Sequence, residues 1–124
     1  MSGFLIDTNI FSEIFKDNDE IIRYVSELEA YIDTVIYIEC LQGSKSKNEK
    51  AAIKRLLASF PIISINESIA KHAISLIDKY SNSHGLLLAD ALIASSAMSA
   101  GMTVVTFNLS DFKFIDGLTI VKPN

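Results

Sequence analysis

The sequence predicts one α/β domain, residues 1–124, in which a mostly parallel sheet of four or five strands is covered by helices on both faces. The length of 124 residues falls in the usual range of a single domain. Apolar residues make up 49% of the chain and charged residues 21%, which is typical of a folded globule. Strand-like runs alternate with helical periodicity, and such alternation forms parallel sheets through right-handed crossovers.

In the first half of the chain, Asn18 or Asp19 suits a helix start, and residues 46–49 (Ser-Lys-Asn-Glu) have the pattern of a capping box. We expect the last helix of this half to bury Ala52, Ile53, Leu56 and Leu57. The expected elements are a strand at 3–6, a helix through 10–15, a helix at 19–28, a strand at 31–36, a short helix opened by Glu39 and ended by Gly43, and a helix at 46–58.

The second half of the chain continues the alternation. A helix capped by Asn66 or Ser64 should bury Ile69, Ala70, Ala73, Ile74 and Ile77. The next helix is apolar or small on nearly every side, so we expect it to lie deep against the sheet. The expected elements are a strand at 62–65, a helix from 66 to about 83, a helix at 86–100 ended by Gly101, a strand at 103–107 and a short strand at 118–121.

Polar residues cluster where the predicted strands end. Asp7 follows the first strand, and Asn108 and Asp111 follow the fourth. In open parallel sheets, ligands bind beyond the carboxyl ends of the strands, near the point where the strand order reverses. Asp90 lies inside the most apolar helix, where a lone carboxylate is costly unless it is hydrogen-bonded, exposed at an edge, neutralised or bound to a cation.

A divalent metal ion would account for these acids. Carboxylates without histidine or cysteine ligands favour Mg²⁺ or Mn²⁺, which bind oxygen donors and keep positions for water and a substrate phosphate. Such ions activate water for phosphodiester hydrolysis. The acids Asp7, Glu39, Asp90 and Asp111 therefore form a candidate catalytic and metal site for cutting nucleic acid.

Four motifs in this order resemble those of the PIN-domain ribonucleases, and within them the VapC-like toxins of toxin-antitoxin pairs. The resemblance implies a three-layer α/β/α fold and metal ligation by Asp7, Glu39 and Asp90. A fourth ligand would be Asp111 or Asn108, of which we favour Asp111. The motifs are FLIDTNI at 4–10, TVIYIE at 34–39 with Gly43 beyond, LADALIA at 88–94 and VTFNLSDF at 105–112.

The same resemblance implies an endoribonuclease that depends on Mg²⁺ or Mn²⁺, acts on RNA, forms homodimers and is inhibited by a cognate antitoxin. Polar neighbours of the acids would orient the carboxylates or metal-bound water. These neighbours are Thr8, Asn9, Thr34, Thr106 and Asn108.

Each of these residues also has a purely structural interpretation. Asp7 could simply cap a helix, Glu39 could be a surface residue, and Asn108 and Asp111 could bond to their own turn. The net charge of −4 argues only weakly against RNA as a substrate. The chain has fifteen acidic and eleven basic residues, so without the four candidate acids the remaining eleven acidic residues balance the eleven basic ones. A basic cluster could steer an RNA backbone or form a solvated helix face; it comprises Lys45, Lys47, Lys50, Lys54 and Arg55.

Two kinds of non-catalytic protein remain as alternatives: a PIN-like binding domain and a receiver-like signalling domain. A receiver would need an acidic pair after the first strand and a lysine after a late one, but Asp7 precedes Thr8-Asn9 and residues 106–108 contain no lysine. The single cysteine, Cys40, excludes an internal disulfide, and no signal-like or membrane-spanning run is present. We therefore expect a soluble cytoplasmic protein.

Overall fold

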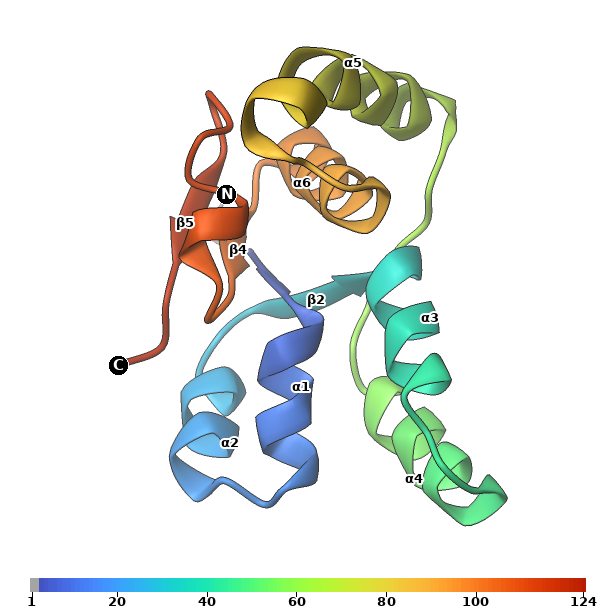
Figure 1. Ribbon diagram of the computed structural model, residues 1–124. Helices are drawn as coiled ribbons and strands as arrows, with labels where there is room; N and C mark the ends of the chain where they lie inside the picture. Colours follow the sequence, from blue (N-terminus) through green and yellow to red (C-terminus); the bar gives the residue numbers. More distant parts are fainter. Residues whose placement is uncertain (1–2) are drawn as a thin grey trace.

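Five parallel strands form the central sheet of the computed structural model, which describes residues 3–124 (Figure 1). The strand order is β3-β2-β1-β4-β5, so it reverses between β1 and β4. Leu5 of β1 pairs with Tyr31 on one side and with Val104 on the other. A receiver-like domain has its strands in the order 2-1-3-4-5, so this alternative is excluded. The strands are β1 (Phe4–Ile6), β2 (Ala30–Asp33), β3 (Ile62–Ile63), β4 (Thr103–Val105) and β5 (Thr119–Val121).

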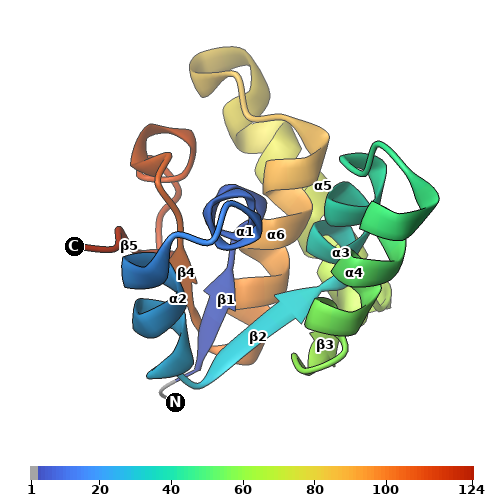
Figure 2. The ribbon, with the colours of Figure 1, turned by 90° about the horizontal axis from the view of Figure 1, so that it is seen from below.

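Helices cover both faces of the sheet, which confirms the predicted α/β/α architecture. Figure 1 shows α5 and α6 above the sheet and α1 and α2 below it, and Figure 2 shows α3 and α4 beside the end of β2. The helices are α1 (Thr8–Phe15), α2 (Asp19–Ser26), α3 (Thr34–Gln42), α4 (Lys47–Leu57), α5 (Glu67–His84) and α6 (Leu88–Ala100), with a short 3₁₀ helix η1 (Leu109–Asp111).

The helix α6 lies as deep as the sequence predicts. Ala91, Ile93 and Ala94 have no exposed surface, and Ser95 and Ser96 are equally buried. Gly101 ends the helix in the left-handed conformation, with φ of 66°, which glycine adopts without strain. The first turn of α6 is less buried than the rest of the helix: Leu88 and the preceding Leu87 are each 71% exposed. No helix within residues 3–124 has both the length and the apolar character needed to cross a membrane.

Side-chain caps fix most helix starts where the sequence places them. The Asn18 side chain accepts a hydrogen bond from Ile21 N–H, and the Asn66 side chain accepts one from Ile69 N–H. The Ser46 hydroxyl accepts from Glu49 N–H, which is half of the predicted capping box. The other half differs, because the Glu49 carboxylate accepts from the N–H of Lys45 instead of that of Ser46.

One strand prediction was wrong in a way that affects the site. The predicted strand 31–36 ends at Asp33, and Thr34 begins α3. The Asp33 carboxylate caps this helix by accepting from Ile36 N–H at 2.8 Å, which overrides the strand preference of the β-branched run that follows. Glu39 consequently lies in the middle of α3 and does not open the helix.

Several smaller predictions also need correction. The strands predicted at 62–65 and 103–107 end at Ile63 and Val105, and the predicted helix 86–100 starts only at Leu88. Ala52 is exposed, and Ile74 is 70% exposed. In α5 the buried stripe instead comprises Ile69, Ala73, Leu76 and Tyr80, whose spacing follows the helical repeat more closely.

Candidate active site

Asp7 lies where the strand order of the sheet reverses. It follows β1 directly, is only 7% exposed, and serves as the N-cap of α1. Its Oδ1 accepts a hydrogen bond from the backbone N–H of Thr8 at 2.8 Å. Its Oδ2 accepts one from the hydroxyl of Thr106 at 2.8 Å. The cap interpretation is therefore correct, and it leaves the carboxylate at the sheet edge where a ligand would bind.

A buried hydroxyl joins the ends of β1 and β4. Besides donating to Asp7, Thr106 Oγ1 accepts from the Asn9 side-chain amide at 3.2 Å and from the backbone N–H of Asn108 at 3.0 Å. The Asn9 carbonyl oxygen in turn accepts from Phe107 N–H at 3.2 Å. The network fixes the orientation of the Asp7 carboxylate relative to both strands.

Glu39 reaches the same edge from α3. The Thr8 hydroxyl donates to Glu39 Oε1 at 2.6 Å. Thr8 therefore contacts two of the candidate acids, Asp7 through its backbone and Glu39 through its side chain. Short hydrogen bonds to carboxylates restrict their rotation, so the pair is held in a defined orientation.

Asp90, in the first turn of α6, completes the group of interacting acids. Burial, followed by the charges of Asp7, Asp111 and Glu39, raises the pKa of Asp90 to about 7. Burial also raises the pKa of Asp7, although its hydrogen bonds with Thr106 and Thr8 oppose this, and the charges of Glu39 and Asp111 add to the increase. These carboxylates lie close enough to repel one another, so the edge is electrostatically unfavourable while it is empty of cations.

Asp111 and Asn108, the two candidates for the fourth position, both lie exposed after β4. Asp111 ends η1 with its side chain exposed, and its charge acts on both Asp7 and Asp90. Asn108 is exposed, and its contacts are through the backbone: its N–H donates to Thr106 Oγ1, and its carbonyl oxygen accepts from Asp111 N–H at 3.1 Å.

The carboxylates are grouped loosely. Within residues 3–124, no three His, Cys, Asp or Glu side chains are close enough together to hold a metal ion as they stand. Mg²⁺ generally keeps several of its waters and takes only one or two carboxylates, with substrate phosphates completing the shell. An all-oxygen, loosely grouped set of donors fits such an ion better than it fits zinc.

Other predicted site residues lie outside this network. Thr34 Oγ1 accepts a hydrogen bond from Ile65 N–H at 3.4 Å and so ties α3 to the segment after β3. The basic cluster, Lys45, Lys47, Lys50, Lys54 and Arg55, is exposed along and just before α4. Cys40 is buried, and burial raises the pKa of its thiol to about 12, which fits a packing residue and not a nucleophile.

Asp33 was missed as a candidate. It is fully buried at the end of β2, and burial raises its pKa. Neither its Oδ2 atom nor the hydroxyl of Ser96 has a hydrogen-bond partner within the described residues, although Ser96 is close enough to lower the Asp33 pKa in part. An aspartate at a strand end followed by helical spacing could have revealed it, but the strand predicted through Ile36 concealed this signal.

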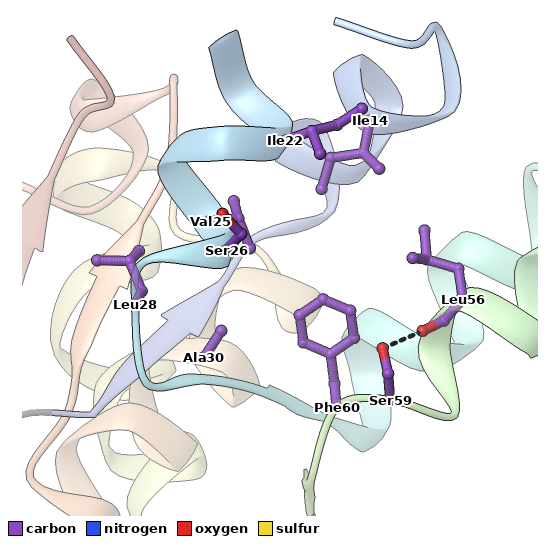
Figure 3. Close-up of a pocket in the computed structure, with 9 residues that line it drawn as sticks. All are labelled: Ile14, Ile22, Val25, Ser26, Leu28, Ala30, Leu56, Ser59 and Phe60. Atoms are coloured by element: carbon purple, nitrogen blue, oxygen red, sulfur yellow. Dashed lines mark hydrogen bonds between the residues drawn. The ribbon is translucent and has the colours of Figure 1, made fainter. Parts of the chain in front are cut away.

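Three hollows of different character lie on the described part of the chain, and one of them includes site residues. A hollow of about 120 Å³, which we name the inner hollow, contains Thr8 and Glu39 in its wall. An apolar hollow of about 330 Å³ lies between α1, α2 and the end of α4, with Ile22 and Phe60 facing it (Figure 3). A third hollow, of about 380 Å³, lies between α5 and α6, and Ile74 and Leu88 line it.

Comparison with known proteins explains this arrangement. The family model of the PIN domain matches residues 4–118. The chain belongs to the PIN domain family. Ribonuclease VapC1 of Rickettsia felis is 28% identical over an alignment of 127 positions, which spans 96% of this chain and 95% of that protein.

Solved PIN structures share the fold. A toxin-antitoxin complex from Klebsiella pneumoniae contains a chain that is 27% identical, with a TM-score of 0.81 and 97% of each chain covered. A DNA-bound VapBC from Salmonella typhimurium has a chain with a TM-score of 0.85 that covers 100% of both chains at 23% identity. The family membership and the three-layer fold that the motifs predict are thus confirmed.

Proposed function

We propose that this PIN domain is a metal-dependent endoribonuclease that hydrolyses RNA phosphodiester bonds and is the toxin of a toxin-antitoxin pair. The observation that carries the proposal is the interaction of four acids near the strand-order reversal: the charges of Glu39 and Asp111 act on both Asp7 and Asp90 and contribute to the raised pKa of each. The similarity to a ribonuclease VapC1 over nearly the full length supports the reaction. The chain would work as one domain in the cytoplasm, where its RNA substrates are found.

The four acids would hold one or two Mg²⁺ or Mn²⁺ ions. A bound ion of this kind supplies positive charge and lowers the pKa of its water, so that hydroxide is available near neutral pH. Thr106 and Thr8 hold Asp7 and Glu39 in fixed orientations, which avoids reorganisation during the reaction. The burial of Asp7 keeps bulk water away from its carboxylate and strengthens its interaction with a cation.

An antitoxin is the proposed protein partner. The similar chain from Klebsiella pneumoniae comes from a toxin-antitoxin complex, which supports such a pairing here. The hollow of Figure 3 is lined mainly by apolar side chains, among them the partly exposed Ile22, and such a surface suits apolar side chains of a partner segment.

A second copy of the chain is the other proposed partner. Ile74, Leu87 and Leu88 are each at least 70% exposed, and Ile74 and Leu88 line the hollow between α5 and α6. Adjoining apolar side chains that are exposed in this way often form an interface with another protein chain. We expect light scattering to give the mass of two chains of 13.7 kDa; a monomer at micromolar concentration would contradict the homodimer.

The decisive experiment for the reaction is cleavage of total RNA with Mg²⁺ or Mn²⁺, with the fragment ends mapped. We expect cuts at defined positions by the unchanged chain, no cuts in EDTA, and none by Asp90→Asn. The remaining alternative, a PIN-like binding domain without catalysis, predicts RNA or protein binding with no metal-dependent cleavage under any of these conditions. If Asp90→Asn cuts RNA as the unchanged chain does, the proposed active site is wrong.

A further inference from the structure

The inner hollow does not end at the carboxylates. A neighbouring outer hollow of about 530 Å³ shares Ser12, Phe15 and Ile53 with it and extends to Lys16 and Lys45. Thr8, Ser12 and Phe15 are spaced i, i+4 and i+7 on α1, so they form one stripe along the helix. At 1.5 Å per residue, this stripe leads about 10 Å away from the candidate site. The two hollows thus form a groove that connects Glu39, one of the candidate acids, with an aromatic ring and two lysines.

Phe15 is unusual among the aromatic side chains of the chain. It is 40% exposed, whereas its neighbour Phe11, 6.4 Å away between ring centres, has no exposed surface. Phe11 also contacts Phe60 in an edge-to-face arrangement. Phe15 therefore presents a ring to the groove on a rigid helix, close to the site.

The positive charges beside this ring are available to a ligand. Lys45 is exposed and forms no ion pair with any residue of 3–124. Lys16 pairs with Glu13 at 3.3 Å, but this is an exposed pair, and such pairs contribute little and exchange readily. Glu49 also lines the groove, and its Oε1 accepts a hydrogen bond from the N–H of Lys45.

An exposed aromatic ring flanked by cations matches single-stranded nucleic acid, in which flat bases alternate with phosphates. On the basis of the nuclease function proposed above, we propose that Phe15 stacks on an RNA base beside the scissile phosphate, while Lys16 and Lys45 bind the phosphate that follows. Phe15 and these lysines thereby form a substrate subsite separate from the carboxylates. The remaining lysines of α4 contribute only to the wider electrostatic field.

Binding of a fluorescein-labelled single-stranded RNA of mixed sequence, followed by anisotropy, tests this subsite. All proteins carry Asp90→Asn, so that no cleavage interferes. We expect Phe15→Leu to weaken binding about tenfold, because it keeps apolar bulk but removes the stacking face. Phe15→Tyr should bind as the parent does. Thermal unfolding of each variant, read by circular dichroism, shows whether the fold is intact.

The lysines are tested with a matched control. Lys16 and Lys71 each form a short-range ion pair with a glutamate, and their side-chain exposures are 72% and 73%, but Lys16 is the C-cap of α1 whereas Lys71 lies on α5. We expect Lys16→Ala and Lys45→Ala each to weaken binding several-fold and to lower the salt slope by about 0.7, with Lys71→Ala unchanged. Equal effects at Lys16 and Lys71 would show a general charge effect and overturn the assignment of Lys16.

The subsite and the nuclease function can fail separately. If Phe15→Leu binds RNA as tightly as the parent while Asp90 is still required for cleavage, the subsite is wrong and the function stands. If Phe15→Leu weakens RNA binding but the unchanged chain cuts no RNA, the groove binds RNA and the nuclease proposal is wrong. If Phe15→Leu affects only inhibition by a co-expressed protein, the groove is a protein-binding surface and the RNA subsite is overturned.

Discussion

The two sides of the candidate site compensate their negative charge differently. On the β1 side, Asp7 accepts hydrogen bonds from Thr8 and Thr106, which offset part of the effect of burial. On the α6 side, Asp90 is half-buried, and no hydrogen bond is among the causes that set its pKa of about 7. The first carboxylate is thus held in position by the fold, and the second depends on a proton or a cation. The comparison predicts which substitutions disturb folding and which affect only function.

The largest expected effect is the loss of RNA cleavage in Asp7→Asn and Asp90→Asn, by on the order of a thousandfold. Without metal, Asp90→Asn should melt at a higher temperature than the unchanged chain, because it removes a like charge and breaks no hydrogen bond. The melting temperature of Asp7→Asn should rise less. The amide nitrogen of the new side chain is itself a donor, and it would face one of the two donors, Thr8 N–H or the Thr106 hydroxyl, that the carboxylate now satisfies. Differential scanning calorimetry in EDTA measures both. Unfolding of both variants would instead assign these acids a structural role.

The next largest effect concerns the hydroxyl that orients Asp7. Thr106→Val keeps the shape but removes the hydroxyl that donates to Asp7 Oδ2 and accepts from the Asn9 amide, so we expect a loss of about 1–3 kcal/mol in unfolding free energy. Cleavage should fall as well, whereas Thr106→Ser should retain both. Thr103→Val is a control of the same type, at the first residue of β4, the strand that Thr106 follows. A cleavage rate for Thr106→Val equal to that of the unchanged protein would show that Asp7 needs no such orientation.

An effect of similar size on stability is expected from metal binding. If Mg²⁺ binds only the folded chain, a concentration one hundred times its Kd stabilises by about 2.7 kcal/mol, and the melting temperature rises accordingly. Asp90→Asn should lose most of this increase, because it removes a charge that the ion offsets. An equal increase in both proteins would place the ion elsewhere.

The smallest expected effect is the dependence of metal-free stability on pH. The pKa of Asp90 is raised in the folded state to about 7, so between about pH 4 and pH 7 the folded chain binds more protons than the unfolded chain. Stability from this group therefore decreases as the pH rises through that window. Melting in EDTA should occur at a higher temperature at pH 5 than at pH 8, and Asp90→Asn should show a weaker dependence. A steeper dependence in the variant would contradict the raised pKa.

The sequence predicted the order of elements because the period of apolar residues is a local property. Each strand and helix exists where its pattern lies, including the deep helix α6 and its end at Gly101. The end of the second strand at Asp33 was not predicted, because the β-branched run that follows favours a strand locally. The cap that the Asp33 carboxylate forms with Ile36 N–H depends on the fully buried position of Asp33 in the folded chain. The exposure of Ile74 was missed for a related reason, since the neighbours of α5 choose which face is buried.

By itself, the sequence determined the α/β alternation, the family motifs and the identity of the candidate acids, since these follow from residue type and spacing. The tertiary structure alone decided that Thr106 binds Asp7 across 99 positions and that Thr8 joins Asp7 to Glu39. It also decided that Phe15 faces a groove while Phe11 is buried. Such contacts depend on strand order and helix packing, which bring together residues that no local pattern relates.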